Sequence, residues 1–214
     1  MINILLNDAN DNLSGKKELI GRAARAAEEY AFPRLKIDWD IDVLFEKYLY
    51  DMILFDDMIG GRVRSRDFVE ISIRGDGVTE DLLAEILVFY LCHAARRGKN
   101  DEFERTLFYK LVDEGIATFF EAEFAATRGE KTAFISEVLS KTDEENEQML
   151  NGLLDQLDSE DYDYGNIFIA NDGNSLRWSG YALGYYLVKK YLDNTGKKIE
   201  DAYADSFDSF KEVL

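Results

Sequence analysis

The chain has 214 residues, of which 46% are hydrophobic, and its formal net charge is −18 at pH 7. This length and apolar content suffice for one domain with its own core. Because nucleic acids and anionic membranes reward clustered Lys and Arg, the acidic balance argues against both as partners. A single cysteine excludes an internal disulfide, and no apolar run is long enough to span a membrane, so we expect a cytoplasmic protein.

The N-terminal part of the chain predicts two strands around one helix. A short apolar run at residues 2–6 predicts the first strand. A helix is predicted from about residue 16 to residue 30, and Pro33 is expected to stop it. Across residues 35–43 apolar and charged side chains alternate strictly, which predicts a strand with one buried face.

The following segment is less uniform. Residues 45–58 are rich in Tyr, Leu and Phe, and their periodicity does not decide between a helix and an irregular loop. Gly60 and Gly61 predict a turn. Beyond them, apolar and polar residues alternate again, so a further strand is predicted at residues 67–73.

The rest of the chain is predicted to be mainly helical, because apolar residues recur at helical spacing between capping and turn residues. Turn-rich sequence is found around residues 164–166 and 172–174. Helices are predicted at residues 80–97, 101–124, 131–139, 143–157, 178–192 and 199–213. Together these elements indicate one α+β domain over residues 1–214, helix-rich, with a small N-terminal mixed sheet and a helical C-terminal half.

The helix predicted at residues 80–97 holds the only histidine of the chain, His93. Helical spacing places His93 on the same stripe as Phe89, one turn earlier. On the next predicted helix, Glu114 lies in a mostly apolar row. A carboxylate in such a row needs a partner, and His93 is the natural candidate.

Three stretches carry a resemblance to a known family. They are Phe89 to His93, which reads FYLCH, then Glu114 with Gly115, and residues 178–185, which read WSGYALGY. In this register the chain resembles a family of small zinc-dependent metallopeptidases of unknown function that are similar to gluzincins. In that family the central helix reads H-E-x-x-H, an E-G-x-A motif supplies a glutamate ligand, and a W-x-G-Y-x-x-G-Y helix packs behind. The resemblance spans nearly the whole chain and implies a zincin-like domain.

The sequence departs from this family at the zinc motif itself. Phe89 stands at the position of the first histidine ligand, and Tyr90 stands at the position of the general base. Phenylalanine cannot bind a metal, and tyrosine, with a pKa near 10, is a poor base at neutral pH. His93 and Glu114 occupy the retained ligand positions, but catalytic zinc usually has three protein ligands. The resemblance therefore implies a metallopeptidase scaffold that binds zinc weakly or not at all.

Three functional interpretations follow from these residues. The first is a catalytically silent pseudoenzyme that binds a peptide along the strand at residues 67–73, which the resemblance places at the edge of the sheet. The second is an active metallohydrolase that holds a metal through His93, Glu114 and a further, unidentified ligand. The third is a metal-free interaction protein. Tyr181 matches a tyrosine of the late family motif, where it either stabilises an oxyanion or packs in the core.

Overall fold

The computed structural model describes residues 1–8, 13–47, 54–55, 59–100, 105–128, 131–169 and 178–214. The chain divides into two compact units. The first comprises Met1–Lys99 and Glu123–Thr132, and the second comprises Asn100–Ala122 and Ala133–Leu214. The expectation of a single domain over the whole chain stays a prediction.

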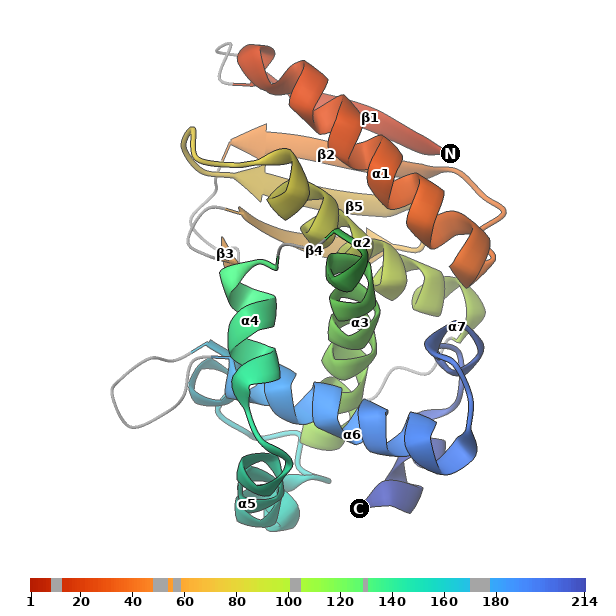
Figure 1. The fold of residues 1–214 in the computed structure, drawn as a ribbon, viewed down its shortest axis with the longest axis vertical. Coiled ribbons are helices and arrows are strands. Elements are labelled where there is room, and N and C mark those ends of the chain that lie inside the picture. Colours follow the sequence, from red (N-terminus) through yellow and green to blue (C-terminus); the bar gives the residue numbers. More distant parts are fainter. Residues whose placement is uncertain (9–12, 48–53, 56–58, 101–104, 129–130, 170–177) are drawn as a thin grey trace. The chain divides into compact units, whose positions relative to one another are not determined.

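The first unit is built on a five-stranded mixed sheet in the order β1-β2-β5-β4-β3 (Figure 1). β1, β2 and β5 run parallel, whereas β4 is antiparallel to both β5 and β3. Val43 lies opposite Val69 and Phe45 opposite Ile71, and all four side chains are buried, as the alternating sequence predicts. The strands are β1 (Ile2–Asn7), β2 (Ile41–Lys47), β3 (Leu54–Phe55), β4 (Ile59–Ser65) and β5 (Phe68–Ile73).

Two helices cover one face of this sheet, α1 (Lys17–Leu35) and α2 (Glu80–Lys99) (Figure 1). They pack against each other along much of their length. The side of α1 that is buried carries alanines such as Ala23, Ala27 and Ala31, whose small side chains allow close helix packing. α2 also contacts β4 and β5. The helix predicted at residues 80–97 is therefore confirmed as α2.

Two expectations for the end of α1 are wrong. The helix continues through Pro33 to Leu35, because a proline in the last turn removes only one backbone hydrogen bond from a segment that is about to end. The strand predicted at residues 35–43 begins only at Ile41, because its pairing with β1 starts where Ile41 lies opposite Ile2. Alternating polarity marked the buried side chains correctly but not the residues that have a strand partner.

The turn predicted at Gly60 and Gly61 is also wrong, since both residues lie within β4. At Gly61 a Cβ atom would lie 2.6 Å from the carbonyl oxygen of Glu70 and 2.7 Å from Cε2 of Tyr90. Glycine is required there by close packing against a neighbouring strand and a helix side chain, and not by a change of chain direction.

The predicted strand at residues 67–73 is confirmed as β5, but its predicted place at the sheet edge is wrong. β5 pairs with β2 on one side and with β4 on the other. Its backbone groups are therefore used within the sheet, and no peptide can add beside it as a further strand. Among the described strands, β1 and β3 are the outer ones.

The second unit is helical. Its first helix is the N-terminal part of α3 (Leu107–Arg128), whose last residues, from Glu123 onward, belong to the first unit. The predicted start of this helix at residue 101 and the predicted turn at residues 172–174 lie outside the described residues. The other helices are α4 (Ala133–Ser140), α5 (Asp143–Leu153), α6 (Ser179–Thr195), α7 (Ile199–Ala202) and α8 (Phe207–Phe210).

The C-terminal segment forms short helical pieces and not the single helix predicted at residues 199–213. α7 ends at Ala202, and Ser206 then caps α8 by accepting a hydrogen bond from the backbone N–H of Asp208. The apolar anchors in this segment are nevertheless buried, namely Tyr203, Phe207 and Phe210. With a small mixed sheet in the N-terminal half and helices in the C-terminal half, the predicted α+β class is confirmed.

α3 and α6 approach each other closely within the second unit. A Cβ atom on Gly115 would lie 2.7 Å from the Cα of Gly184 and closer still to its carbonyl group. A Cβ atom on Gly184 would in turn collide with the backbone of Leu111. Glycine at position 184 thus allows the two helix backbones to lie in contact. The other glycine of that motif, Gly180, packs against the ring of Phe168 and not against a helix backbone.

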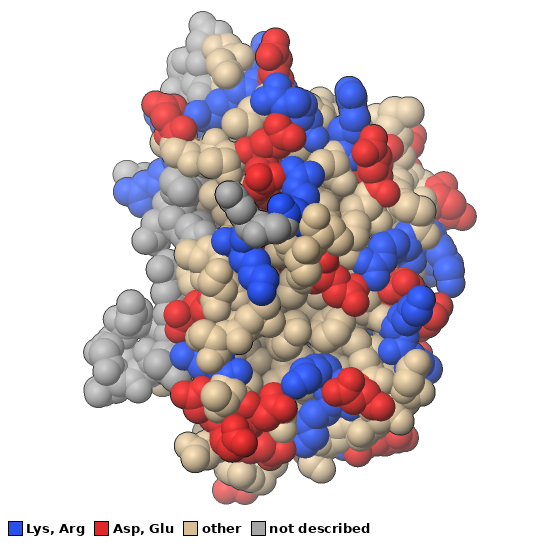
Figure 2. Space-filling view, viewed as in Figure 1, with Lys and Arg blue, Asp and Glu red and all other residues tan. Residues whose placement is uncertain are grey.

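Charged side chains of both signs lie on the face shown in Figure 2, where Lys and Arg lie among Asp and Glu. Ion pairs within the first unit include Arg34 with Glu123 at 2.6 Å and Arg22 with Glu80 at 2.6 Å. None of the helices in the described ranges is both long enough and apolar enough to cross a bilayer.

The contact between α3 and α6 leads to the first prediction. We expect Gly115→Ala to lower the free energy of unfolding by about 3 kcal/mol, because the added methyl group meets backbone atoms that cannot move aside. Urea denaturation monitored by circular dichroism measures the change. Gly152→Ala in α5 is the matched control, because nothing lies within 4 Å of its Cβ position, and it should leave stability unchanged or raise it slightly. Equal effects of the two variants would contradict the close approach.

Candidate metal centre

The positions that resemble the zinc motif lie on α2, in the first unit, and they hold a cluster of aromatic rings. The ring centroids of Phe89 and His93 lie 4.8 Å apart at 74°, and those of Phe89 and Tyr90 lie 5.2 Å apart at 89°. Phe89 is 2% exposed and Tyr90 is 6% exposed. Edge-to-face contacts of this kind stabilise the helix surface, but they place no metal-binding atom beside His93 at the Phe89 position.

Tyr90 also fills the space between α2 and the sheet. Its ring lies over Gly61 of β4, where a Cβ atom would collide with it. A glutamate at position 90 would leave much of this space empty. Tyr90 therefore acts in the structure as a packing residue. The residue that it packs against is Gly61, one of the two glycines from which the sequence predicts a turn.

Glu114 lies on α3 in the second unit and is only 5% exposed. Its carboxylate forms an ion pair with Lys110, one turn earlier on the same helix. The prediction that a carboxylate in this apolar row needs a partner is confirmed, and Lys110 is one such partner. The i, i+4 spacing of the two residues is the sequence signal that could have identified it. Pairing of Glu114 with His93 stays a prediction.

Two tyrosines surround this ion pair. The Lys110 ammonium lies 5.7 Å from the ring centroid of Tyr164, and a hydrogen bond joins the side chains of Tyr164 and Tyr181. The ring of Phe168 stacks on Tyr164, with centroids 4.8 Å apart, and meets the ring of Tyr181 edge-on at 5.4 Å. Tyr181 is thus held by packing and by a hydrogen bond. Its predicted role as an oxyanion donor remains untested.

The electrostatics of this cluster keep it in one protonation state at neutral pH. Burial raises the pKa of Tyr164 to about 12, and the negative charge of Glu114 acts in the same direction. Burial alone would lower the pKa of Lys110, but the negative charges of Glu114 and Asp113 hold it above its usual value. The lysine is therefore charged and the phenol neutral at pH 7, and neither has a pKa suited to proton transfer there.

The residues available as metal ligands differ from those of a catalytic zinc site. Within the second unit, carboxylate oxygens of Asp113 and Glu114 lie within 4.8 Å of each other. Sequence analysis missed Asp113, although it directly precedes Glu114. The Lys110 ammonium already neutralises Glu114 and would oppose a cation bound to it, and Phe89 provides no ligand. The side chains present therefore depart from the zinc motif of the resembling family at the positions of Phe89 and Tyr90.

Comparison with known proteins gives the family. A family model described as Predicted Zn-dependent protease (DUF2268) matches residues 24–212. The match covers most of the chain, which therefore belongs to this family. No curated protein and no solved structure matches the chain. The resemblance to zinc metallopeptidase-like proteins is thus confirmed at the level of the family.

The ion pair on α3 leads to the second prediction. Replacing Lys110 with methionine should lower the free energy of unfolding by about 3 kcal/mol, because it removes the partner of a buried carboxylate. Glu114→Gln should cost less, since the Lys110 side chain is 28% exposed and can reach water. The double variant should recover most of the loss in a double-mutant cycle measured by urea denaturation. Additive losses would show that the two side chains do not depend on each other.

The raised pKa of Tyr164 leads to the third prediction. A tyrosine whose pKa is higher in the folded state stabilises the fold below its unfolded pKa of about 10, and this contribution disappears as the pH rises toward about 12. We therefore expect the free energy of unfolding of Tyr164→Phe to fall less between about pH 9 and pH 11 than that of the unchanged chain. Denaturation curves at both pH values measure this difference. Parallel losses in the two proteins would contradict the buried phenol.

Proposed function

We propose that this member of the protease family is a pseudoenzyme, which has lost zinc-dependent peptide hydrolysis and has kept the scaffold for binding. The observation that carries the proposal is the aromatic cluster on α2. Phe89 and Tyr90 are buried at the positions where the family motif has a metal ligand and a general base. Neither side chain can supply the missing function.

The ion pair on α3 supports the same conclusion from the second unit. Glu114 is the retained ligand position of the second family motif, and its charge is balanced by Lys110. Burial of the Glu114 carboxylate away from water is tolerated because its partner, Lys110, lies on the same helix. The stability of this arrangement does not require a metal ion, and we therefore assign no catalytic step to zinc in this chain.

Peptide binding is the retained activity that we propose, with a changed location. Because β5 is paired on both sides, an extended peptide would have to add to an outer strand of the sheet. β1 is an outer strand that exposes Ile4 and Leu5. Nucleic acids and anionic membranes are not proposed as partners, in accordance with the net charge of −18.

The second candidate is an active metallohydrolase with an atypical site. It would use His93 and Glu114 as ligands, and the carboxylate of Asp113 beside Glu114 is the observation that favours it. This alternative requires that a metal displace Lys110 from Glu114. Metal content therefore separates it from the pseudoenzyme.

The fourth prediction concerns zinc content. The unchanged chain should retain far less than one zinc per molecule after dialysis, whereas Phe89→His combined with Tyr90→Glu should increase zinc affinity by restoring the missing ligand and base. Adding Lys110→Met should increase it further by freeing Glu114. Elemental analysis, titration against a chromophoric chelator and cleavage of a mixed peptide pool measure these effects.

A second double variant controls for the loss of aromatic packing. Phe89→Leu with Tyr90→Phe disturbs the same positions without adding a ligand, so it should remain metal-free. Circular dichroism should show that all variants fold. Stoichiometric zinc in the unchanged chain would overturn the pseudoenzyme proposal and favour the metallohydrolase.

A further inference from the structure

The outer edge of β1 presents backbone groups that the sheet does not use. The carbonyl of Met1 accepts a hydrogen bond from the N–H of Ile41 on β2 at 2.9 Å. Because successive residues of a strand direct their backbone groups to alternate sides, this bond fixes which residues face away from β2. They are Ile2, Ile4 and Leu6. β1 lies at the rim of the sheet beside α1, and no described strand pairs with this side of it (Figure 1).

β1 lacks the features that usually protect an edge strand from further pairing. Its sequence, INILLN, contains no charged residue and no proline, and its register with β2 has no bulge. Ile4 lies beside the buried Val43 and is 39% exposed, whereas Leu5 points to the opposite face and is 41% exposed. An extended segment that adds here therefore meets apolar side chains on both faces as well as unused N–H and C=O groups.

Two carboxylates flank the Ile2 end of this edge. Glu28, on the helix that covers one face of the sheet, accepts a hydrogen bond from the N–H of Ile2 at 2.9 Å. Asp42 lies on the other face and accepts a hydrogen bond from the side-chain amide of Asn3 at 2.9 Å. Both donors are neutral, and neither carboxylate forms an ion pair within the part of the chain that the structure describes. Two negative charges at this end of β1 are therefore not balanced by a neighbouring cation.

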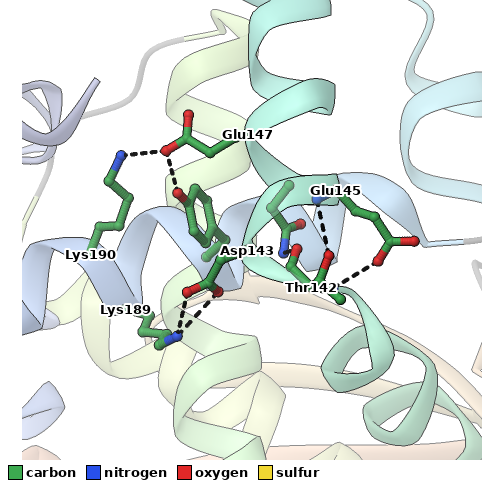
Figure 3. A network of polar contacts seen from close by, with 8 residues as sticks. Thr142, Asp143, Glu145, Glu147, Lys189 and Lys190 are labelled. Atoms are coloured by element: carbon green, nitrogen blue, oxygen red, sulfur yellow. Dashed lines mark hydrogen bonds and ion pairs between the residues drawn. The ribbon is translucent and has the colours of Figure 1, made fainter.

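The pocket between α4, α5 and α6 in the second unit differs in this respect. Its volume is about 180 Å³, and Lys141, Asn146 and Lys189 are among its lining residues. Lys141 forms an ion pair with Glu137 at 3.2 Å, and Lys189 forms one with Asp143 at 3.2 Å (Figure 3). Because these charges are already balanced, the pocket does not indicate a charged ligand.

Charge also favours a peptide over a second copy of the chain as the segment that adds to β1. Antiparallel pairing of two β1 strands would set the end that carries Glu28 and Asp42 against the opposite end, where Asp8 follows the strand. The Asp8 carboxylate accepts a hydrogen bond from the neutral N–H of Leu13, so like charges would meet at both ends. Each copy also has a net charge of −18. A basic segment meets opposite charge instead.

We propose that the outer edge of β1 binds an extended peptide with two consecutive basic residues beside Ile2 and β-branched or apolar residues further along. Successive side chains of a strand point to opposite faces, so one basic residue reaches Glu28 and the next reaches Asp42. Antiparallel pairing, which is more stable per residue than parallel pairing, places the basic pair at the carboxyl end of the peptide. This specificity rests on the peptide binding proposed above and names the class of peptide.

Fluorescence anisotropy of labelled peptides mixed with the full chain tests the proposal. The peptide Val-Thr-Val-Thr-Lys-Lys should bind with a Kd of about 100 μM or lower, and Val-Thr-Val-Thr-Glu-Glu at least about tenfold more weakly. Glu28→Gln and Asp42→Asn should each weaken binding of the lysine peptide about threefold, because each removes one exposed charge and keeps an oxygen acceptor. Glu29→Gln is the matched control. It removes the same charge from the next position of α1, which faces another side of the helix, and should change Kd by less than about 1.5-fold.

Two N-methylated forms of the lysine peptide separate strand pairing from charge attraction. One form is methylated at alternate backbone nitrogens from its first residue, and the other from its second residue. Only the form whose methylated nitrogens face β1 should lose binding, whereas the other should keep Kd within about threefold.

The outcomes distinguish the peptide class from the peptide binding itself. Equal binding of the lysine and glutamate peptides, with only one N-methylated form inactive, would overturn the basic specificity and leave peptide binding at β1 in place. Equal effects of the two N-methylated forms, or no binding of either peptide, would overturn strand addition at β1 and the specificity with it. Sedimentation velocity should show a monomer. A dimer that Leu5→Lys disperses would assign the edge to a second copy and overturn the proposal as well.

Discussion

The burial of one carboxylate, that of Glu114, constrains the whole of the second unit. A charged group in an apolar helix row is tolerated only with a partner, and Lys110 provides the opposite charge from the same helix. The next residue, Gly115, lies against the backbone of α6, so the carboxylate cannot shift without disturbing that contact. Tyr164 then packs over the lysine and is held neutral by the same burial. The residue at a ligand position of the resembling family's motif is thus paired here with a lysine of its own helix.

In the first unit, aromatic residues occupy the positions at which a zinc motif carries polar groups on a buried helix face. In a zinc motif, the helix must carry polar ligands on a face that is otherwise buried, which opposes stability. Phe89 and Tyr90 remove this cost, because their rings pack against His93 and over Gly61. The substitution at position 90 and the glycine on β4 are complementary in shape. Aromatic residues at these two positions therefore favour local packing over the polar groups that a zinc motif requires.

Much of the secondary structure could be predicted, because the apolar period differs between strands and helices. β5, α2 and α6 follow from this period, whereas β1 follows from a short apolar run. Pairing could not be derived in the same way: β5 is central only because β4 joins it, and the two glycines of β4 carry a local signal for a turn. The candidate site likewise contains residues that can be predicted from local sequence and residues that cannot. That Glu114 needs a partner can be predicted from the apolar row of its helix, and Lys110 could be identified from its i, i+4 spacing. Tyr164 could not, because it comes from a distant turn-rich segment that carries no local signal.

These differences indicate which kind of function the chain can retain. Catalysis by the family's motif needs several polar groups in register, and Phe89 and Tyr90 provide neither a zinc ligand nor a base effective at neutral pH. Binding needs only a preformed surface with matched charges, and a strand edge or a pocket can supply it. The pocket lined by Lys141, Asn146 and Lys189 is formed by α4, α5 and α6 of the second unit, whereas the zinc-motif positions lie on α2 of the first unit. The pseudoenzyme that we propose would therefore lose the polar groups of α2 in the first unit while the helices of the second unit keep their packing.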